Sequence, residues 1–197
     1  MTKAPILLSA LLAPLLLAGC ISFGAAPPPS LLTLTSEAAV PIGQNQSSAG
    51  GRTITVAVPA VPQSLATARV PVQATPTSIA YVEDAQWAEP PARLFARLLS
   101  DTISSRTGRV VLSQAQNLAD PGARLGGELR QFGIDAATNE AVATFDASLI
   151  RGDAGAVEKR RFEARVPVAM IDAPSSGIAL NQAANQVAGQ VSDWVGR

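Results

Sequence analysis

The stretch Ala141-Val142-Ala143-Thr144-Phe145-Asp146-Ala147-Ser148-Leu149 carries the clearest structural pattern in the chain. Its odd-numbered residues are apolar, whereas Thr144, Asp146 and Ser148 lie on the opposite parity. A period of two is typical of a β-strand with one buried and one solvated face. This stretch therefore predicts a strand that packs against a layer on one side and faces water on the other.

The runs on either side of this stretch repeat the pattern. Phe162, Ala164, Val166 and Val168 share a face of the later run, and turn-forming residues occupy 138–140 and 152–155. In the earlier run Leu125 and Leu129 share a parity that changes by Phe132, which predicts a bulge near Gln131. Three such runs in succession predict an antiparallel meander covered on one face.

Two amphipathic helices are predicted to cover that face. Pro90 and Pro91 suit the first turn of a helix of about 17 residues, which Gly108 ends. A second, alanine-rich helix follows a cap that we expect at Ser175 or Ser176. Their apolar stripes contain Leu94, Phe95, Leu98, Leu99 and Ile103 in the first helix, and Leu180, Ala183, Ala184, Val187, Ala188, Val191, Trp194 and Val195 in the second.

The remaining segments predict short strands at 31–34, 53–58, 69–73, 78–82 and 109–112, and a loop at 36–51. Pro71 predicts that its strand lies at a sheet edge or in an arm. Burying both helical stripes together requires an α+β two-layer sandwich, with a mostly antiparallel β-sheet and two helices packed on one face. We expect residues 31–197 to form this single domain.

Composition narrows the function classes. The 197-residue chain has no histidine, one cysteine, and 15 basic against 15 acidic residues. It therefore lacks the most common general base and zinc ligand, and the balanced charge gives no basic surplus for nucleic acid. We expect no catalytic residue, no metal and no nucleic-acid partner. Chemistry by carboxylates or by a serine–lysine pair stays open, although no spacing favours it.

The N-terminus ends an apolar run on Leu17-Ala18-Gly19-Cys20. The run over 4–18 is about 15 residues, which suits a signal peptide better than the roughly 20 residues of a spanning helix. It resembles the lipobox of bacterial lipoproteins. The resemblance implies that signal peptidase recognises Leu17, Ala18 and Gly19, removes residues 1–19, and leaves Cys20 with diacylglycerol and an N-acyl chain. Residues 20–30, rich in proline, then form a flexible tether. The alternatives are an ordinary signal peptide or a transmembrane anchor.

Further segments carry a family resemblance. Trp87-Ala88-Glu89-Pro90 stands before the first predicted helix, and Leu32-Thr33-Leu34, Val56-Ala57-Val58-Pro59 and the alanine-rich last helix occupy matching places. With the lipobox, they make the chain similar to the ABC-type transport auxiliary lipoproteins, the PqiC-like component of MCE-type lipid transport systems. The chain also has no phosphate-binding loop of the P-loop pattern, in keeping with a component that leaves ATP chemistry to its partners.

The resemblance implies a non-enzymatic, lipid-anchored component on the periplasmic face of the outer membrane. Ile21 follows the lipidated cysteine where an aspartate would resemble an inner-membrane retention signal. The implied partners are the membrane, an MCE-domain protein and an ABC permease–ATPase pair that moves phospholipids or other hydrophobic substrates; a homo-oligomer is a further candidate. A lipid-binding carrier or chaperone, and a hydrolase built on carboxylates such as Glu83 and Asp84, are the alternatives.

Several residues are candidates for docking a partner. Trp87, Glu89 and Pro90 could form an epitope, or Trp87 could fill the seam between sheet and helix while Glu89 favours the helix N-terminus. Val70, Val72 and Tyr81, with Ile79, could form an arm that pairs with a neighbouring subunit. A third candidate set could contact lipid phosphates or simply lie on a solvated sheet face; its members are Arg130, Arg151, Arg160, Arg161 and Arg165.

Overall fold

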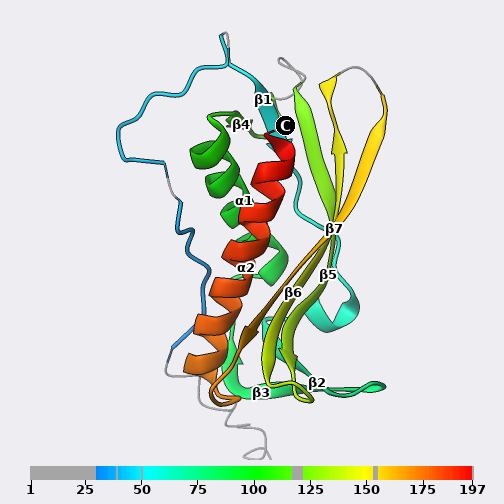
Figure 1. Cartoon of the computed structure of the whole chain (residues 1–197). Helices are drawn as coiled ribbons and strands as arrows, with labels where there is room; N and C mark the ends of the chain where they lie inside the picture. The colour runs from blue at the N-terminus through cyan, green and yellow to red at the C-terminus, as the bar shows by residue number, and fades with distance from the viewer. Residues whose placement is uncertain (1–29, 39, 50, 117–121, 153–154, 197) are drawn as a thin grey trace, which may run out of the picture.

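A computed structural model describes residues 30–38, 40–49, 51–116, 122–152 and 155–196. These residues form one seven-stranded mixed sheet with two α-helices on one face, an α+β fold (Figure 1). The α+β prediction is thereby confirmed. In chain order the elements are β1 (Thr53–Val56), the 3₁₀ turn η2 (Gln63–Leu65), β2 (Arg69–Thr75), β3 (Ser78–Gln86), α1 (Pro91–Thr107), β4 (Val110–Leu112), β5 (Ala123–Asp135), β6 (Glu140–Ile150), β7 (Val157–Pro167) and α2 (Ala173–Val195).

The predicted meander forms one half of the sheet. β5 and β6 pair antiparallel from Arg124 opposite Ile150 to Asp135 opposite Glu140, and β7 pairs with β6 along its whole length. The register of β5 against β6 shifts between Leu129 and Gln131, where the change of parity predicted a bulge. The strongest pairing therefore joins strands that are neighbours in sequence, as the alternation predicted.

The other half of the sheet is a fork along the free side of β5. β1 runs parallel to the start of β5 and carries β4 on its far side, whereas β2 runs parallel to the end of β5 and carries β3. The predicted edge position of Pro71 is wrong, because β2 lies between β3 and β5. The strand accommodates the proline through a register shift beside it and through Gly133, which stands close to its carbonyl group.

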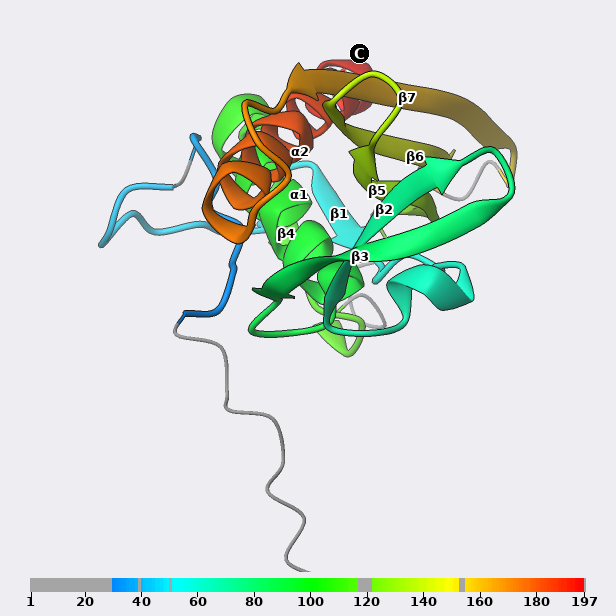
Figure 2. The same ribbon diagram turned by 90° about the horizontal axis from the view of Figure 1, so that it is seen from below.

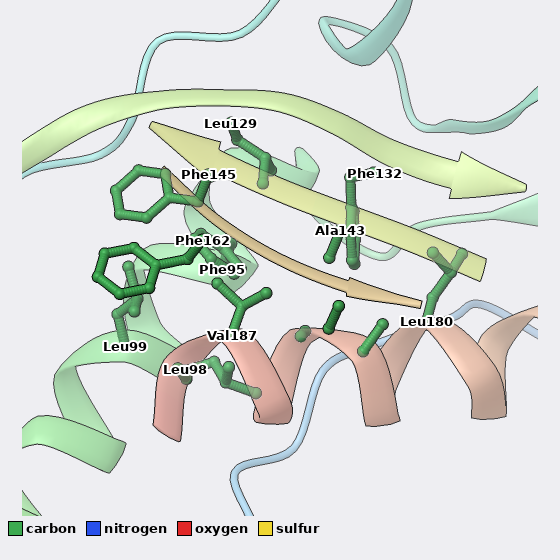
Figure 3. Packing of buried hydrophobic residues seen from close by; sticks show 14 of the residues in the cluster. Phe95, Leu98, Leu99, Leu129, Phe132, Ala143, Phe145, Phe162, Leu180 and Val187 are labelled. Atoms are coloured by element: carbon green, nitrogen blue, oxygen red, sulfur yellow. The ribbon is translucent and has the colours of Figure 1, made fainter. Parts of the chain in front are cut away.

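Both helices lie on one face of the sheet, and large apolar side chains fill the space between the layers (Figures 1 and 3). Phe95 of α1 meets Phe145 of β6 edge to face, with ring centroids 5.3 Å apart. Phe162 of β7 packs against Trp194 of α2 at 5.5 Å. Phe95 and Phe145 are almost fully buried, so the sandwich has a continuous core and no lumen at this point.

The helix ends agree with the sequence at α1 and differ at α2. α1 follows Pro90, begins with Pro91 and ends at Gly108 in the left-handed conformation, with φ of 66°. α2 is capped by Asp172, which accepts a hydrogen bond from the Ser175 backbone N–H, so the predicted serine cap is wrong. An aspartate is an equally good cap, and it precedes the helix start at Ala173. Neither helix of the described chain is long and apolar enough to cross a membrane.

Residues 32–37 form an extended segment, here called the strap, that runs along α2 (Figure 2). Leu32 bridges the end of β3: its N–H donates to the Gln86 carbonyl and its own carbonyl accepts from Ala88 N–H. Farther along, Asn185 of α2 bonds the backbone of Thr35 and Glu37. The predicted strand at 31–34 is thus reduced to one bridge, and the chain enters the domain at the N-terminal end of α2.

Candidate functional site

The lipid-attachment residue Cys20 and the recognition residues Leu17, Ala18 and Gly19 lie outside the described residues. The described chain begins at Ser30, and Leu32 fixes its entry point, because a side chain at Gly177 of α2 would meet the Leu32 methyl group. Of the exposed large apolar side chains in the described residues, half lie at this same end of the molecule: Leu31, Met170, Ile171 and Ile178.

Three of the predicted docking residues are buried. Trp87 is 2% exposed and stacks on Phe132 of β5 with ring centroids 5.3 Å apart. Val70 and Val72 on β2 belong to the same apolar core. Trp87 therefore fills the seam between sheet and helix, which was the structural alternative to an epitope. None of these three side chains offers a surface in the folded domain.

The other three predicted docking residues lie at the surface. Glu89 is half-buried and both of its carboxylate oxygens accept hydrogen bonds from Arg97, at 2.8 and 2.9 Å. Pro90 is exposed beside it. Tyr81 lies on β3, away from this pair, and the Arg69 guanidinium stacks over its ring at 4.2 Å. The structure thus divides the exposed candidates between the start of α1 and the β2–β3 hairpin.

A groove lies between the β2–β3 hairpin and η2, along the part of β5 near its bulge. It has a volume of about 270 Å³, and Pro62, Leu65, Pro71 and Ile79 give it an apolar lining. Ile79 is 48% exposed. Sequence reasoning missed the contribution of η2, because a three-residue 3₁₀ turn leaves no periodic pattern. The prolines at 59 and 62 marked only the end of the preceding strand.

The outward face of the meander is an ionic surface. Arg161 donates two hydrogen bonds to Asp146, at 2.6 and 2.7 Å, and they lower the pKa of the Asp146 carboxyl. Arg165 donates to Glu163 at 2.8 Å and likewise lowers the pKa of Glu163. Arg130 lies within 4 Å of Asp146. These arginines have carboxylate partners, which favours the solvated sheet face over a lipid-phosphate site.

The remaining two arginines of that candidate set have different surroundings. Arg160 stacks over the Phe162 ring at 5.2 Å. Arg151 pairs with Glu158 at 2.7 Å and also donates to the last carbonyls of α2.

The two carboxylates considered for a hydrolase, Glu83 and Asp84, are exposed within β3. Asp84 adopts a φ of 52° where the pairing with β2 is irregular. Within the described ranges no three His, Cys, Asp or Glu side chains gather as metal ligands.

The fold and the surface place the protein in a general class. It is a small α+β domain with a packed core, and its surface carries grooves and ion-paired faces. The chain belongs to the family of ABC-type transport auxiliary lipoprotein components, whose sequence profile matches residues 32–192. It is therefore an auxiliary component of an ABC-type transport system and a membrane-anchored lipoprotein of the cell envelope. The family resemblance drawn from the Trp87-Ala88-Glu89-Pro90 junction is confirmed.

Solved structures share the fold. A crystal structure of a Xanthomonas campestris protein assigned to the DUF330 family superposes with a TM-score of 0.68 at 20% identity, covering 84% of this chain and 94% of that chain. A second crystal structure, of an uncharacterized protein, gives 0.62 at 18% identity, covering 73% and 90% respectively. A search of curated protein sequences gives no match.

Proposed function

We propose that this protein is a non-enzymatic docking and tethering component. Lipid on Cys20 would hold it at the periplasmic face of the outer membrane. From there it would engage an MCE-domain protein and an ABC permease–ATPase pair that move phospholipids or other hydrophobic substrates. The family membership supports the transport role. The observation that carries the docking role is the packed core of the described domain, because a domain with a filled interior recognises other molecules at its surface.

The dimensions of the groove beside the β2–β3 hairpin support docking over carriage at that place. Pockets for small-molecule ligands are roughly 300–1,000 Å³ and bury most of the ligand. The groove beside the β2–β3 hairpin, at about 270 Å³, is below that range and open. It suits one or two apolar side chains of a partner, with the exposed Ile79 in its wall. The alternative carrier function would require a diacyl lipid to open the core between Phe95 and Phe145.

Site-specific photocrosslinking in intact cells tests the docking role. A photoreactive amino acid replaces Ile79 in the tagged full-length protein, and the captured proteins are identified by mass spectrometry. Ile178 on α2 is the matched control, since it is also an exposed isoleucine. We expect capture of an MCE-domain protein or a permease from position 79 and not from 178. Equal capture from both positions, or capture of neither partner, contradicts docking at the hairpin.

Lipid anchoring has its own test. One acyl chain holds a protein only marginally, whereas two or more hold it stably. We expect Cys20→Ala to leave the protein as uncleaved precursor or to release it from membranes, as measured by fractionation and by the mass of the N-terminus. A Cys20→Ala protein that is cleaved normally and stays in the outer-membrane fraction would overturn the lipoprotein assignment.

Analysis of the lipids bound to the purified protein distinguishes the carrier function from the docking function. The full-length protein is purified in detergent, and its organic extract is compared with the acyl chains that Cys20 itself retains. A stoichiometric, non-covalent phospholipid would favour the carrier, because the docking role requires no bound lipid.

A further inference from the structure

Three arginine side chains converge at the end of the sheet opposite the strap entry. Arg52 directly precedes β1, Arg109 directly precedes β4, and Arg151 directly follows β6. All three line an open pocket of about 400 Å³, the arginine pocket, whose wall is completed by glycines and small residues: Gly51, Thr53, Gly122, Ala123 and Gly152. The parallel arrangement of β1, β4 and β5 brings these distant positions together.

Arg109 is the buried member of the cluster. Its side chain is 6% exposed, it donates one hydrogen bond to the Val195 carbonyl at 3.3 Å, and its Nε has no partner. Desolvation lowers the pKa of its guanidinium, and repulsion from Arg52 and Arg151 lowers it further. A buried guanidinium with an unused donor and only cations as charged neighbours is costly. Among the described residues, no carboxylate pairs with Arg109.

A purely structural role accounts for part of the cluster. Arg151 donates to the carbonyls of Val195 and Trp194 at 3.2 and 3.1 Å, so it caps the C-terminus of α2. A helix C-terminus carries about half a negative charge, and Glu158 adds one more. Against three guanidinium groups, the partners found among the described residues leave more than one positive charge uncompensated. Arg52 is exposed and forms no ion pair within the described chain, so the capping role does not involve it.

We propose that the arginine pocket binds a phosphate group, either as the free anion or as part of a phosphate-bearing headgroup. Guanidinium groups donate paired hydrogen bonds that match phosphate oxygens. Phosphate presents more oxygens and more charge than a carboxylate, so it can engage several guanidiniums at once. The pocket is open at its mouth, which leaves room for a substituent on the phosphate. The inference is independent of the proposed docking at the hairpin.

Titration calorimetry on the full-length protein in a non-ionic detergent tests the site. Inorganic phosphate probes the free anion, short-chain phosphatidylglycerol probes the headgroup, and acetate probes carboxylates. The informative variant is Arg52→Gln, because this exposed side chain contacts nothing that folding requires. The matched control is Arg93→Gln on α1, which removes the same charge from another exposed arginine without an ion pair.

We expect saturable binding of at least one phosphate probe, weakened about tenfold by Arg52→Gln, which is the usual effect of losing one charge-assisted hydrogen bond. Arg93→Gln should bind like the wild type. Binding of inorganic phosphate alone assigns the free anion, and binding of phosphatidylglycerol assigns a headgroup; either supports the site. Absence of binding to both probes, equal weakening by the two variants, or equal affinity for acetate overturns it.

Discussion

The two halves of the sheet are built in different ways. In the meander, β5, β6 and β7 follow one another in sequence and form long antiparallel pairings, interrupted by one bulge in β5. In the fork, β1 and β2 each reach β5 over a few residues, from segments more than 60 residues away in the chain. The ionic face lies on the meander, whereas the groove and the arginine pocket lie where the fork meets the meander strands.

The difference indicates which half of the sheet is the more stable and which half offers surface to other molecules. Long strand pairing and packed aromatic rings make the meander the stable half. Its side chains mostly contact one another, in the core or in ion pairs. Short parallel pairings leave gaps along β5, and the apolar groove and the arginine pocket lie in those gaps. Surfaces that recognise other molecules are commonly found in such less regular parts of a fold.

The largest expected effect is in the meander core. Phe145→Ala removes a ring that packs edge to face with Phe95, and burial at 1% exposure leaves no route for solvent to fill the cavity. We expect a loss of about 3–5 kcal/mol in the free energy of unfolding, measured by urea denaturation. Leu65→Ala in η2 should cost about 2 kcal/mol, because its surroundings border the open groove. If the two substitutions lowered the free energy of unfolding equally, the meander would not be the more stable half of the sheet.

A smaller effect tests the fork. A methyl group on Gly133 would lie 2.4 Å from the Pro71 carbonyl oxygen, so β2 must move away from β5. We expect Gly133→Ala to cost about 1–3 kcal/mol in thermal or urea unfolding. On the same strand, a methyl group on Gly126 meets its nearest atom at 3.7 Å, so Gly126→Ala should cost less than about 0.5 kcal/mol. If Gly133→Ala left the free energy of unfolding unchanged, β2 and β5 would be able to move apart at this contact without loss of stability.

The smallest effect concerns the ionic face. The Arg165 hydrogen bond lowers the pKa of Glu163 below its ordinary 4.5, so the folded state is stabilised whenever this carboxylate is ionised. At neutral pH, Glu163→Gln should cost less than about 1 kcal/mol, since the pair is largely exposed. That stabilisation is lost as the pH falls below 4.5 through the lowered pKa.

Urea unfolding of wild type and variant at neutral and acidic pH measures this difference, which should shrink at the acidic end. Glu37→Gln is the control, because the exposed Glu37 carboxylate forms no ion pair in the described chain. A difference that grows on acidification would mean that Glu163 is not stabilised in its ionised form.

Sequence patterns predicted the meander, the helices and the bulge because each depends on residues close together in the chain. The alternation around Phe145 identified the core-facing side chains of this strand, although Val142 and Thr144 on the other parity are buried as well. A parity change located the bulge near Gln131. The position of Pro71 was mispredicted because the cost of a proline in an inner strand depends on its neighbour. That neighbour, Gly133, lies far along the chain, so the residues around Pro71 do not predict it.

The candidate site was less accessible to sequence reasoning. An apolar residue at a junction, such as Trp87, has the same local pattern whether it fills a seam or forms an epitope, so only burial distinguishes the two. The arginine pocket left no local pattern either, because Arg52, Arg109 and Arg151 come from three separate strand ends. Of these, only Arg151 belonged to a set considered for phosphate binding.

The strap also determines how the domain responds to mechanical force. A pull on the chain at residue 30 reaches Leu32 first, and its two hydrogen bonds pass the load to the end of β3 and the start of α1. If those bonds break, the force next acts on the backbone N–H groups of Thr35 and then Glu37. Each of these donates a hydrogen bond to an asparagine of α2. Residues 40–49 beyond them contain no helix or strand, so they act as slack before β1. A force on the tether would therefore detach the strap before it reaches β1.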